Sequence, residues 1–114
     1  MTNNIEIYRG DNKTYEVEVK DANGAVVPLT GASIKFTVKV STKDSTPQFQ
    51  LSNSDQSEIE DSDLANGKFK VHIVPANTNS MRASKYIYDI EVTLSGKVFT
   101  VIKDKFQLKA DVTR

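Results

Sequence analysis

The one histidine of the chain, His72, is the first residue that could carry acid–base or metal chemistry. Hydrolytic triads and zinc sites need further partners around such an imidazole. The chain offers no second histidine and no cysteine. Because Val71 and Ile73 flank it in an alternating run, His72 is predicted to point outward from a strand, into solvent and without a partner.

A cluster of carboxylates in the polar stretch 41–63 is the second candidate for chemistry. Carboxylate oxygens are ligands that calcium prefers, but a calcium loop needs a D-x-D-x-D-G pattern with a closing glutamate. The cluster lacks that spacing; its members are Glu58, Glu60, Asp61 and Asp63. We therefore expect a solvated acidic loop and no metal site.

Covalent catalysis and phosphate binding need motifs that this chain does not contain. There is no G-x-S-x-G elbow around a serine, and there is no G-x-G-x-x-G or P-loop glycine pattern. The absence of cysteine also excludes disulfides and thiol nucleophiles. The protein is therefore predicted to be no enzyme and to use no cofactor. Residues 9–11 match an adhesion tripeptide, Arg-Gly-Asp, but a tight turn accounts for the glycine and the aspartate.

The length and charge of the chain exclude further classes of function. The 114 residues suit one domain, 1–114. The chain has 15 basic and 15 acidic residues, and this balance argues against a nucleic-acid partner, which requires a basic surplus. No apolar stretch approaches the ~20 residues that span a membrane. The N-terminus has no cationic and apolar regions of a signal peptide, so we expect synthesis in a cytoplasm without secretion.

The elements that must position any functional surface are strands. Apolar residues recur at every second position in three stretches, 34–40, 69–73 and 86–94, which is typical of strands with one buried face. The turn pairs Asn23-Gly24, Asn66-Gly67 and Ser95-Gly96 stand between such stretches. The predicted shared core consists of Ile34, Phe36, Val38, Phe69, Val71, Ile73, Tyr88, Ile90 and Val92. Val40 continues the inward phase, and Val98 and Phe99 resume the apolar run after the last turn.

The spacing of these signals predicts an all-β domain with seven to eight strands and at most one short helical turn, near 75–84. We favour an immunoglobulin-like, two-sheet antiparallel sandwich. Within the polar stretch, Phe49 and Leu51 are candidates for a short edge strand after Pro47, and Ile59 is a candidate anchor.

Several motifs occur in a fixed order along the chain. They are "IYRGD" at 7–11, "G-x-x-x-P-L-T-G-A" at 24–32, "NGK" at 66–68, "Y-x-Y-D-I-E-V" at 86–92 and "DVTR" at 111–114. This order resembles the immunoglobulin-like β-sandwich family of tailed-phage and prophage structural proteins, which includes the N-terminal domain of upper baseplate proteins. The resemblance implies an architectural or docking role in a virion tail, baseplate or fibre, with no catalytic residues.

The N-terminal strand is the predicted docking site. Open sheet edges are usually protected by charges or prolines; the stretch with Pro47 fits such a guard, whereas "NIEIY" carries only Glu6. We expect Ile5, Ile7 and Tyr8 to dock onto other phage virion proteins, with no nucleic acid and no membrane as partners. In isolation the protein would be a monomer or small homo-oligomer. The alternative is a surface-recognition module that binds host carbohydrate through an exposed aromatic cluster.

Overall fold

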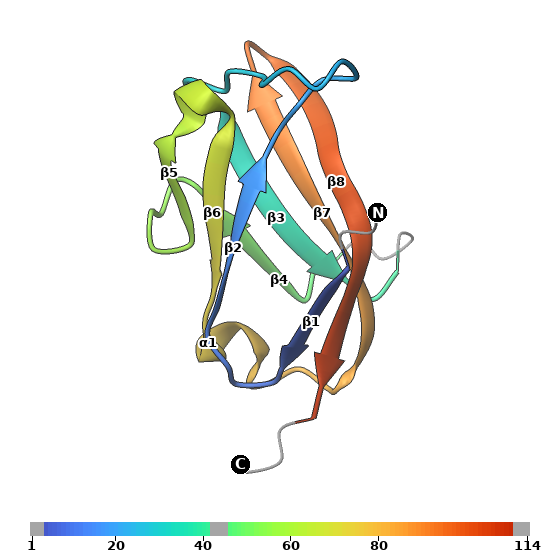
Figure 1. The fold of residues 1–114 in the computed structure, drawn as a ribbon. Helices are drawn as coiled ribbons and strands as arrows, with labels where there is room; N and C mark the ends of the chain where they lie inside the picture. The colour runs from blue at the N-terminus through green and yellow to red at the C-terminus, as the bar shows by residue number, and fades with distance from the viewer. Residues whose placement is uncertain (1–3, 42–45, 111–114) are drawn as a thin grey trace.

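The computed structural model describes residues 4–41 and 46–110, which form a mostly-β fold with eight strands in two sheets (Figure 1). A curled sheet of five strands has the order β1-β8-β7-β3-β4, and a sheet of three strands has the order β2-β6-β5. The strands are β1 Ile5–Tyr8, β2 Lys13–Glu18, β3 Ser33–Lys39, β4 Phe49–Ser52, β5 Ile59–Asp63, β6 Lys68–Ile73, β7 Ser84–Leu94 and β8 Lys97–Lys109. The predicted β-rich arrangement of seven to eight strands in two sheets is thereby confirmed.

The sheets are not antiparallel throughout, and this part of the prediction is wrong. β1 pairs with β8 in parallel, from Ile5 opposite Phe106 to Tyr8 opposite Lys109. All other strand pairs of the two sheets are antiparallel. Hairpins impose antiparallel pairing on neighbours in the chain, but β1 and β8 are separated by almost the whole domain and no hairpin joins them. The alternation of apolar and polar residues within a strand does not indicate whether the strand runs parallel or antiparallel to its neighbour.

The core lies between the inner faces of both sheets. All nine residues predicted for it are buried, so the strand faces were assigned correctly for β3, β6 and β7. Its centre is aromatic: the ring of Phe36 lies 5.3 Å from that of Tyr88 and 6.5 Å from that of Phe106, measured between centroids. Phe49, from the outer strand β4, packs against the same group at 6.1 Å from Phe36.

Val40, which was predicted to point inward, lies at the surface instead, as do two residues of the last predicted apolar run, Val98 and Phe99. Val40 follows the end of β3 and is 55% exposed. Val98 and Phe99 are 61% and 49% exposed, because the hairpin of β7 and β8 continues past the part of the core that the second sheet covers. The β7–β8 register shifts between Ile90 and Glu91, and such a bulge redirects the side chains that follow it.

The turns follow the glycine pattern. In Ser95-Gly96 both residues have positive φ, 54° and 79°, as a two-residue primed hairpin turn requires. Of the pair Asn23-Gly24 only the glycine has positive φ. Gly67 has a φ of 69° and ends the 3-10 helix η1, Leu64–Asn66, where its amide donates to the carbonyl of Leu64.

The polar stretch is more structured than its composition suggests. The edge strand predicted around Phe49 and Leu51 is β4, and Ile59 is fully buried, as expected of an anchor. β5 was not predicted, because the residues after Ile59 have low strand propensity; it forms because Ile59 pairs with Val71 of β6. The helical turn predicted near 75–84 is α1, Pro75–Thr78, but η1 is a second one that the sequence did not reveal.

No helix among the described residues is long and apolar enough to cross a membrane.

Candidate docking surface

β1 is one outer strand of the five-stranded sheet. It pairs with β8 on one side, and its other side has no strand partner in the part of the chain that the structure describes. The opposite outer strand is β4, which directly follows the polar segment containing Pro47. Outer strands leave backbone donors and acceptors able to pair with another chain. β1 therefore offers the open edge that the sequence predicted, and β4 lies beside the predicted guard.

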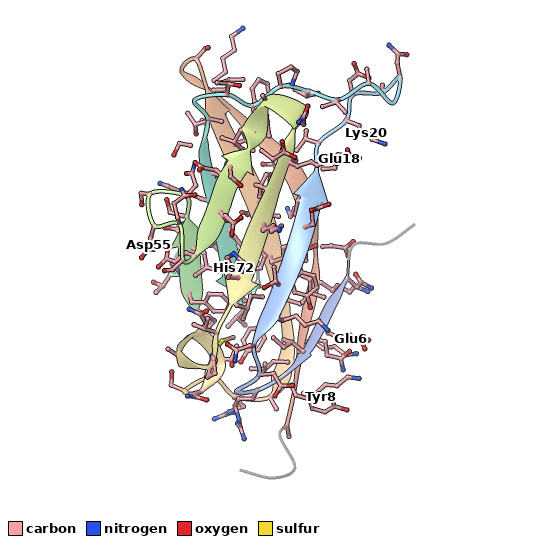
Figure 2. All side chains as sticks on the ribbon, turned by 60° about the vertical axis from the view of Figure 1, so that its left-hand side comes forward. Glu6, Tyr8, Glu18, Lys20, Asp55 and His72 are labelled. Atoms are coloured by element: carbon pink, nitrogen blue, oxygen red, sulfur yellow. The ribbon has the colours of Figure 1, made fainter. Side chains whose placement is uncertain are left out.

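The three predicted docking residues do not share one face of this strand. Ile5 and Ile7 point into the core, with exposed fractions of 6% and 4%. Their side chains cannot contact a partner while the protein stays folded, so at these positions only the backbone edge is accessible. Tyr8 points outward and is 48% exposed. The alternation of β1 thus leaves Glu6 and Tyr8 as its outward side chains (Figure 2).

Tyr8 is held in place by its neighbour on β8. The ammonium of Lys109 lies 5.7 Å from the centroid of the Tyr8 ring, within cation–π range. The same ammonium lies 3.2 Å from a carboxylate oxygen of Glu6. Both contacts are solvent-exposed and contribute little stability. Their effect is to orient the aromatic ring beside an open edge, which is how aromatic anchors serve in protein interfaces.

The turn after β1 is anchored to the segment around α1. The amide of Gly10 donates a 2.9 Å hydrogen bond to the hydroxyl of Thr78, which is fully buried. The guanidinium of Arg9 donates to the carbonyl of Met81 at 3.3 Å. Gly10 itself has a φ of 86°, a conformation that favours glycine. The adhesion-like tripeptide is thus built into a fixed turn, as the sequence indicated.

A groove of about 240 Å³ opens between the sheets, beside the edge strands β1 and β2. Its lining includes the phenols of Tyr15 and Tyr88. Burial raises the pKa of Tyr15. Burial, then the Asp104 carboxylate, then Tyr15 raise the pKa of Tyr88 to about 12. Both phenols are therefore neutral hydrogen-bonding groups at physiological pH and cannot act as anionic nucleophiles there.

His72 points outward from β6, as predicted, but it has partners, so that part of the prediction is wrong. Its Nδ1 lies 2.9 Å from the Thr14 hydroxyl on β2, and its Nε2 lies 3.3 Å from a carboxylate oxygen of Glu60 on β5. The register places Thr14 directly opposite His72, which a single strand's alternation cannot show. The imidazole links all three strands of the sheet that faces the viewer in Figure 2.

A hydroxyl, an imidazole and a carboxylate in sequence invite comparison with a hydrolytic triad. In that triad Nε2 faces the nucleophile and Nδ1 faces the carboxylate. Here the two ring nitrogens are reversed, with Nδ1 toward Thr14 and Nε2 toward Glu60. All three groups lie on the outer face of a sheet that is partly open to water. We interpret the group as a cross-strand brace.

The prediction of an acidic loop is wrong for Glu60, Asp61 and Asp63, which lie in β5 because that strand pairs with β6. Carboxylates of this region accept hydrogen bonds from their neighbours. Glu58 accepts a hydrogen bond from the amide of Ser52, and Asp61 accepts one from the side chain of Asn53. Hydrogen bonds from the hydroxyl and amide of Ser57 lower the pKa of Asp55. Within residues 4–41 and 46–110, no three histidine or carboxylate side chains are grouped so that they could hold a metal ion.

Sequence reasoning missed two surface features. One is the exposed apolar pair Val98 and Phe99 at the β7–β8 hairpin, at the end of the molecule away from β1 (Figure 1). The other is the groove between the sheet edges. No sequence signal identifies the groove, since it depends on how the sheets face one another. The bulge after Ile90 has no marker in the sequence either.

Comparisons with known proteins add no family assignment. No protein-family model matches the chain, and no curated protein matches its sequence.

Proposed function

We propose that this protein is a non-enzymatic structural protein of a tailed-phage or prophage virion, a tail, baseplate or fibre-associated module that docks onto other virion proteins. The observation that carries the docking role is the open edge of β1 with Tyr8 beside it. The virion setting is supported by the resemblance of the motifs at 7–11, 24–32 and 86–92. The proposed site is the backbone edge of β1 together with Tyr8.

An immunoglobulin-like sandwich is part of this proposal. In immunoglobulin domains strands B, E and D belong to one sheet and strands G, F and C to the other, to which variable-type domains add C′ and C″. Here β1 to β8 are compared with strands A, B, C, C′, D, E, F and G, in that order. The orders β2-β6-β5 and β8-β7-β3-β4 agree with that distribution. The departure from the constant-type arrangement is β1, which pairs with β8 and not with β2. That pairing puts β1 at the edge where docking is proposed.

Tyr86 supports the same fold. Its hydroxyl donates a 2.6 Å hydrogen bond to the carbonyl of Arg82, four residues earlier. A tyrosine near the start of the corresponding immunoglobulin strand makes such a backward bond, the tyrosine corner. Two residues later, where antibody domains carry a cysteine, Tyr88 stacks on Phe36. A packed aromatic pair would thus take the place of the disulfide and its tryptophan.

The alternative, a module that binds host carbohydrate, is less well supported. It requires aromatic side chains gathered in an exposed groove. The groove between the sheets does have Tyr15 and Tyr88 in its lining, but Tyr88 is only 3% exposed. The largely exposed aromatic residues of the described chain are Tyr8 and Phe99, and they lie at opposite ends of the molecule. An open edge strand, which favours protein docking by strand addition, is present at β1.

The proposal extends to partners and location. The partners are other virion proteins, with neither nucleic acid nor membrane among them, and the free protein is a monomer or small homo-oligomer. It is made in the cytoplasm of the bacterial host and ends in the virion. The chain has a formal net charge of zero, and a net charge near zero favours association with other proteins.

The test uses Tyr8→Ala with Phe99→Ala as its matched control. Both substitutions remove an aromatic ring that is about half exposed, but from opposite ends of the molecule. Each variant, tagged, is produced in a host that carries the phage, and its content in purified particles is measured by mass spectrometry. Tyr8→Ala should lower incorporation at least about tenfold, the effect of losing an interface anchor, whereas Phe99→Ala should not.

Two results would contradict the proposal. If purified particles lack the wild-type protein, the virion assignment is wrong. If particles contain it and Tyr8→Ala incorporates normally, the β1 edge is not the docking site. Thermal melts of both variants, compared with the wild type, establish that neither result comes from unfolding.

A further inference from the structure

The outer face of the five-stranded sheet carries an excess of lysine. Its outward positions alternate with the core positions of β1, β3, β7 and β8 and are matched across the sheet by the strand register. Six of them are lysines and three are acidic. We call this surface the lysine face; its charged residues are Lys35, Lys39, Lys85, Lys103, Lys105 and Lys109, with Glu6, Asp89 and Glu91.

Each carboxylate of the lysine face stands beside a lysine. Glu6 forms an ion pair with Lys109 at 3.2 Å. The register places Asp89 opposite Lys103 and Glu91 opposite Lys35. Three lysines are therefore in excess, and no ion pair to them is found among the described residues: they are Lys39, Lys85 and Lys105.

The excess lysines surround an apolar centre. Lys39 and Lys105 are both register partners of Ile87. A hollow of about 400 Å³ has Val40, Ile87, Lys85 and Lys105 in its lining, and Glu6 of β1 also lines it. Positive charge around a partly apolar hollow is suited to an acidic protein surface that can insert a side chain.

The outer face of the three-stranded sheet has the opposite charge. Lysines occupy the middle strand and carboxylates occupy both neighbours, so that each lysine is flanked by two acids. One row is Glu16, Lys70 and Glu60, and the next is Glu18, Lys68 and Asp63. We call this surface the acidic face. The first row keeps one uncompensated negative charge. In the second row Lys20, beyond the end of β2, lies 3.2 Å from Glu18 and balances the second acid.

The acidic face is also hollowed. A depression of about 290 Å³ is lined by the carboxylates Glu16, Glu60 and Asp63 and by the two lysines of the middle strand. The two faces are the outward sides of the two layers seen in Figure 1. A chain with a formal net charge of zero thus separates its charges onto opposite sides.

We propose that copies of this chain stack head to tail, the lysine face of one copy against the acidic face of the next. The faces complement each other in sign, and each has a hollow bordered by charges that the other can pair with. Because the two surfaces differ and lie on opposite sides, the contact is heterologous and every added copy leaves a fresh face at each end. This inference does not rest on the proposed virion role, and it extends the small homo-oligomer proposed above to an open stack at low salt.

The alternative occupants of the lysine face are disfavoured by its three carboxylates. Phosphate polymers and anionic membranes require a surplus of unpaired cations, while here half of the lysines already stand beside acids. A face with charges of alternating sign is better suited to a protein surface that carries the opposite charges at the matching positions.

The first measurement is sedimentation velocity at several protein concentrations and two salt concentrations. At about 0.02 M salt, where charges act over ~20–30 Å, the average sedimentation coefficient should rise with protein concentration. At about 0.5 M salt, where screening acts within a few ångströms, it should return to the monomer value. A monomer at all concentrations in low salt would overturn the proposal.

The second measurement distinguishes head-to-tail stacking from symmetric pairing. Lys85→Gln with Lys105→Gln weakens only the lysine face, and Glu16→Gln with Glu60→Gln weakens only the acidic face. Each double variant alone should remain monomeric in low salt. Mixed in equal amounts, they should form a one-to-one dimer that grows no further, because each contributes one intact face.

The matched control removes two lysines that lie outside both faces, Lys13→Gln with Lys97→Gln. It should associate as the wild type does. Association of either face variant alone, no dimer in their mixture, or loss of association in the control would each overturn the proposal. So would binding of double-stranded DNA or of phosphatidylserine vesicles by the wild type in low salt with no self-association.

Discussion

Replacing Phe36 by alanine tests the placement of the core. The Phe36 ring is 1% exposed and contacts three aromatic neighbours: Tyr88, Phe49 and Phe106, at centroid distances of 5.3, 6.1 and 6.5 Å. A buried Phe→Ala change costs about 3–5 kcal/mol, the sum of lost burial and a residual cavity. Each aromatic contact adds about 0.5–1.5 kcal/mol beyond the buried area. We therefore expect Phe36→Ala to lower the free energy of unfolding by about 4–5 kcal/mol, near the upper end of the range for buried Phe→Ala changes.

That loss is a large part of a domain's stability, which is typically about 5–15 kcal/mol. The melting temperature should fall by roughly 15–20 °C, since a domain of this size loses about 4 °C per kcal/mol. The chain has no tryptophan, so urea unfolding is best followed by far-ultraviolet circular dichroism. The slope of the free energy with urea should stay unchanged if only the folded core is altered.

Phe99→Ala is the matched control, because it deletes the same ring at a half-exposed position. It should cost about 0.5 kcal/mol, the usual range for surface positions. Should Phe36→Ala fail to fold, Phe36→Leu provides the measurement with a smaller cavity. A loss below about 1 kcal/mol for Phe36→Ala, or an equal loss for Phe99→Ala, would refute the assignment of the strand faces.

Two further predictions concern a turn and a titration. Gly67→Ala should destabilise the protein by about 1–3 kcal/mol in urea unfolding, because φ is 69° and the new Cβ would lie 2.7 Å from the carbonyl oxygen of Val27. Gly24→Ala, with a φ of 81° but nothing within 4 Å, should cost less; equal costs would contradict the steric account. Tyr88, with its pKa raised from 10.0 to about 12 in the folded state, contributes stability that is fully present below pH 10 and is lost as the pH rises to about 12. Urea unfolding across this range should show a larger loss in the wild type than in Tyr88→Phe, which keeps Tyr15 with its raised pKa, and identical pH profiles would contradict it.

The faces of the central strands could be predicted from sequence alone. In β3, β6 and β7 the apolar residues alternate strictly, and a strand places successive side chains on opposite sides. Burying one face of such a strand leaves only one orientation, so Phe36, Phe69 and Ile90 had to point inward. The tight turns follow for a similarly local reason, since Gly96 and Gly67 adopt positive φ with little strain.

The docking surface could be predicted only in part. The weak protection of the N-terminal strand correctly suggested an open edge at β1. The division of its side chains, with Ile5 and Ile7 inward and Tyr8 outward, depends on which sheet the strand joins and what covers it. The parallel pairing with β8 is a contact between the two ends of the chain, and no local pattern records it.

Tertiary structure alone decided the features that depend on neighbours distant in sequence. His72 acquires two partners because β2 and β5 flank β6 in a particular register. Val98 and Phe99 are exposed because the hairpin outreaches the second sheet, although their sequence is as apolar as a core strand. The opposite charges of the two outer faces likewise arise from strand order, because a sequence with 15 residues of each sign shows only their balance. The alternation of side chains between two faces follows from the backbone of each strand by itself. The pairing and register of the strands, and which of their faces are covered, depend on which strands meet.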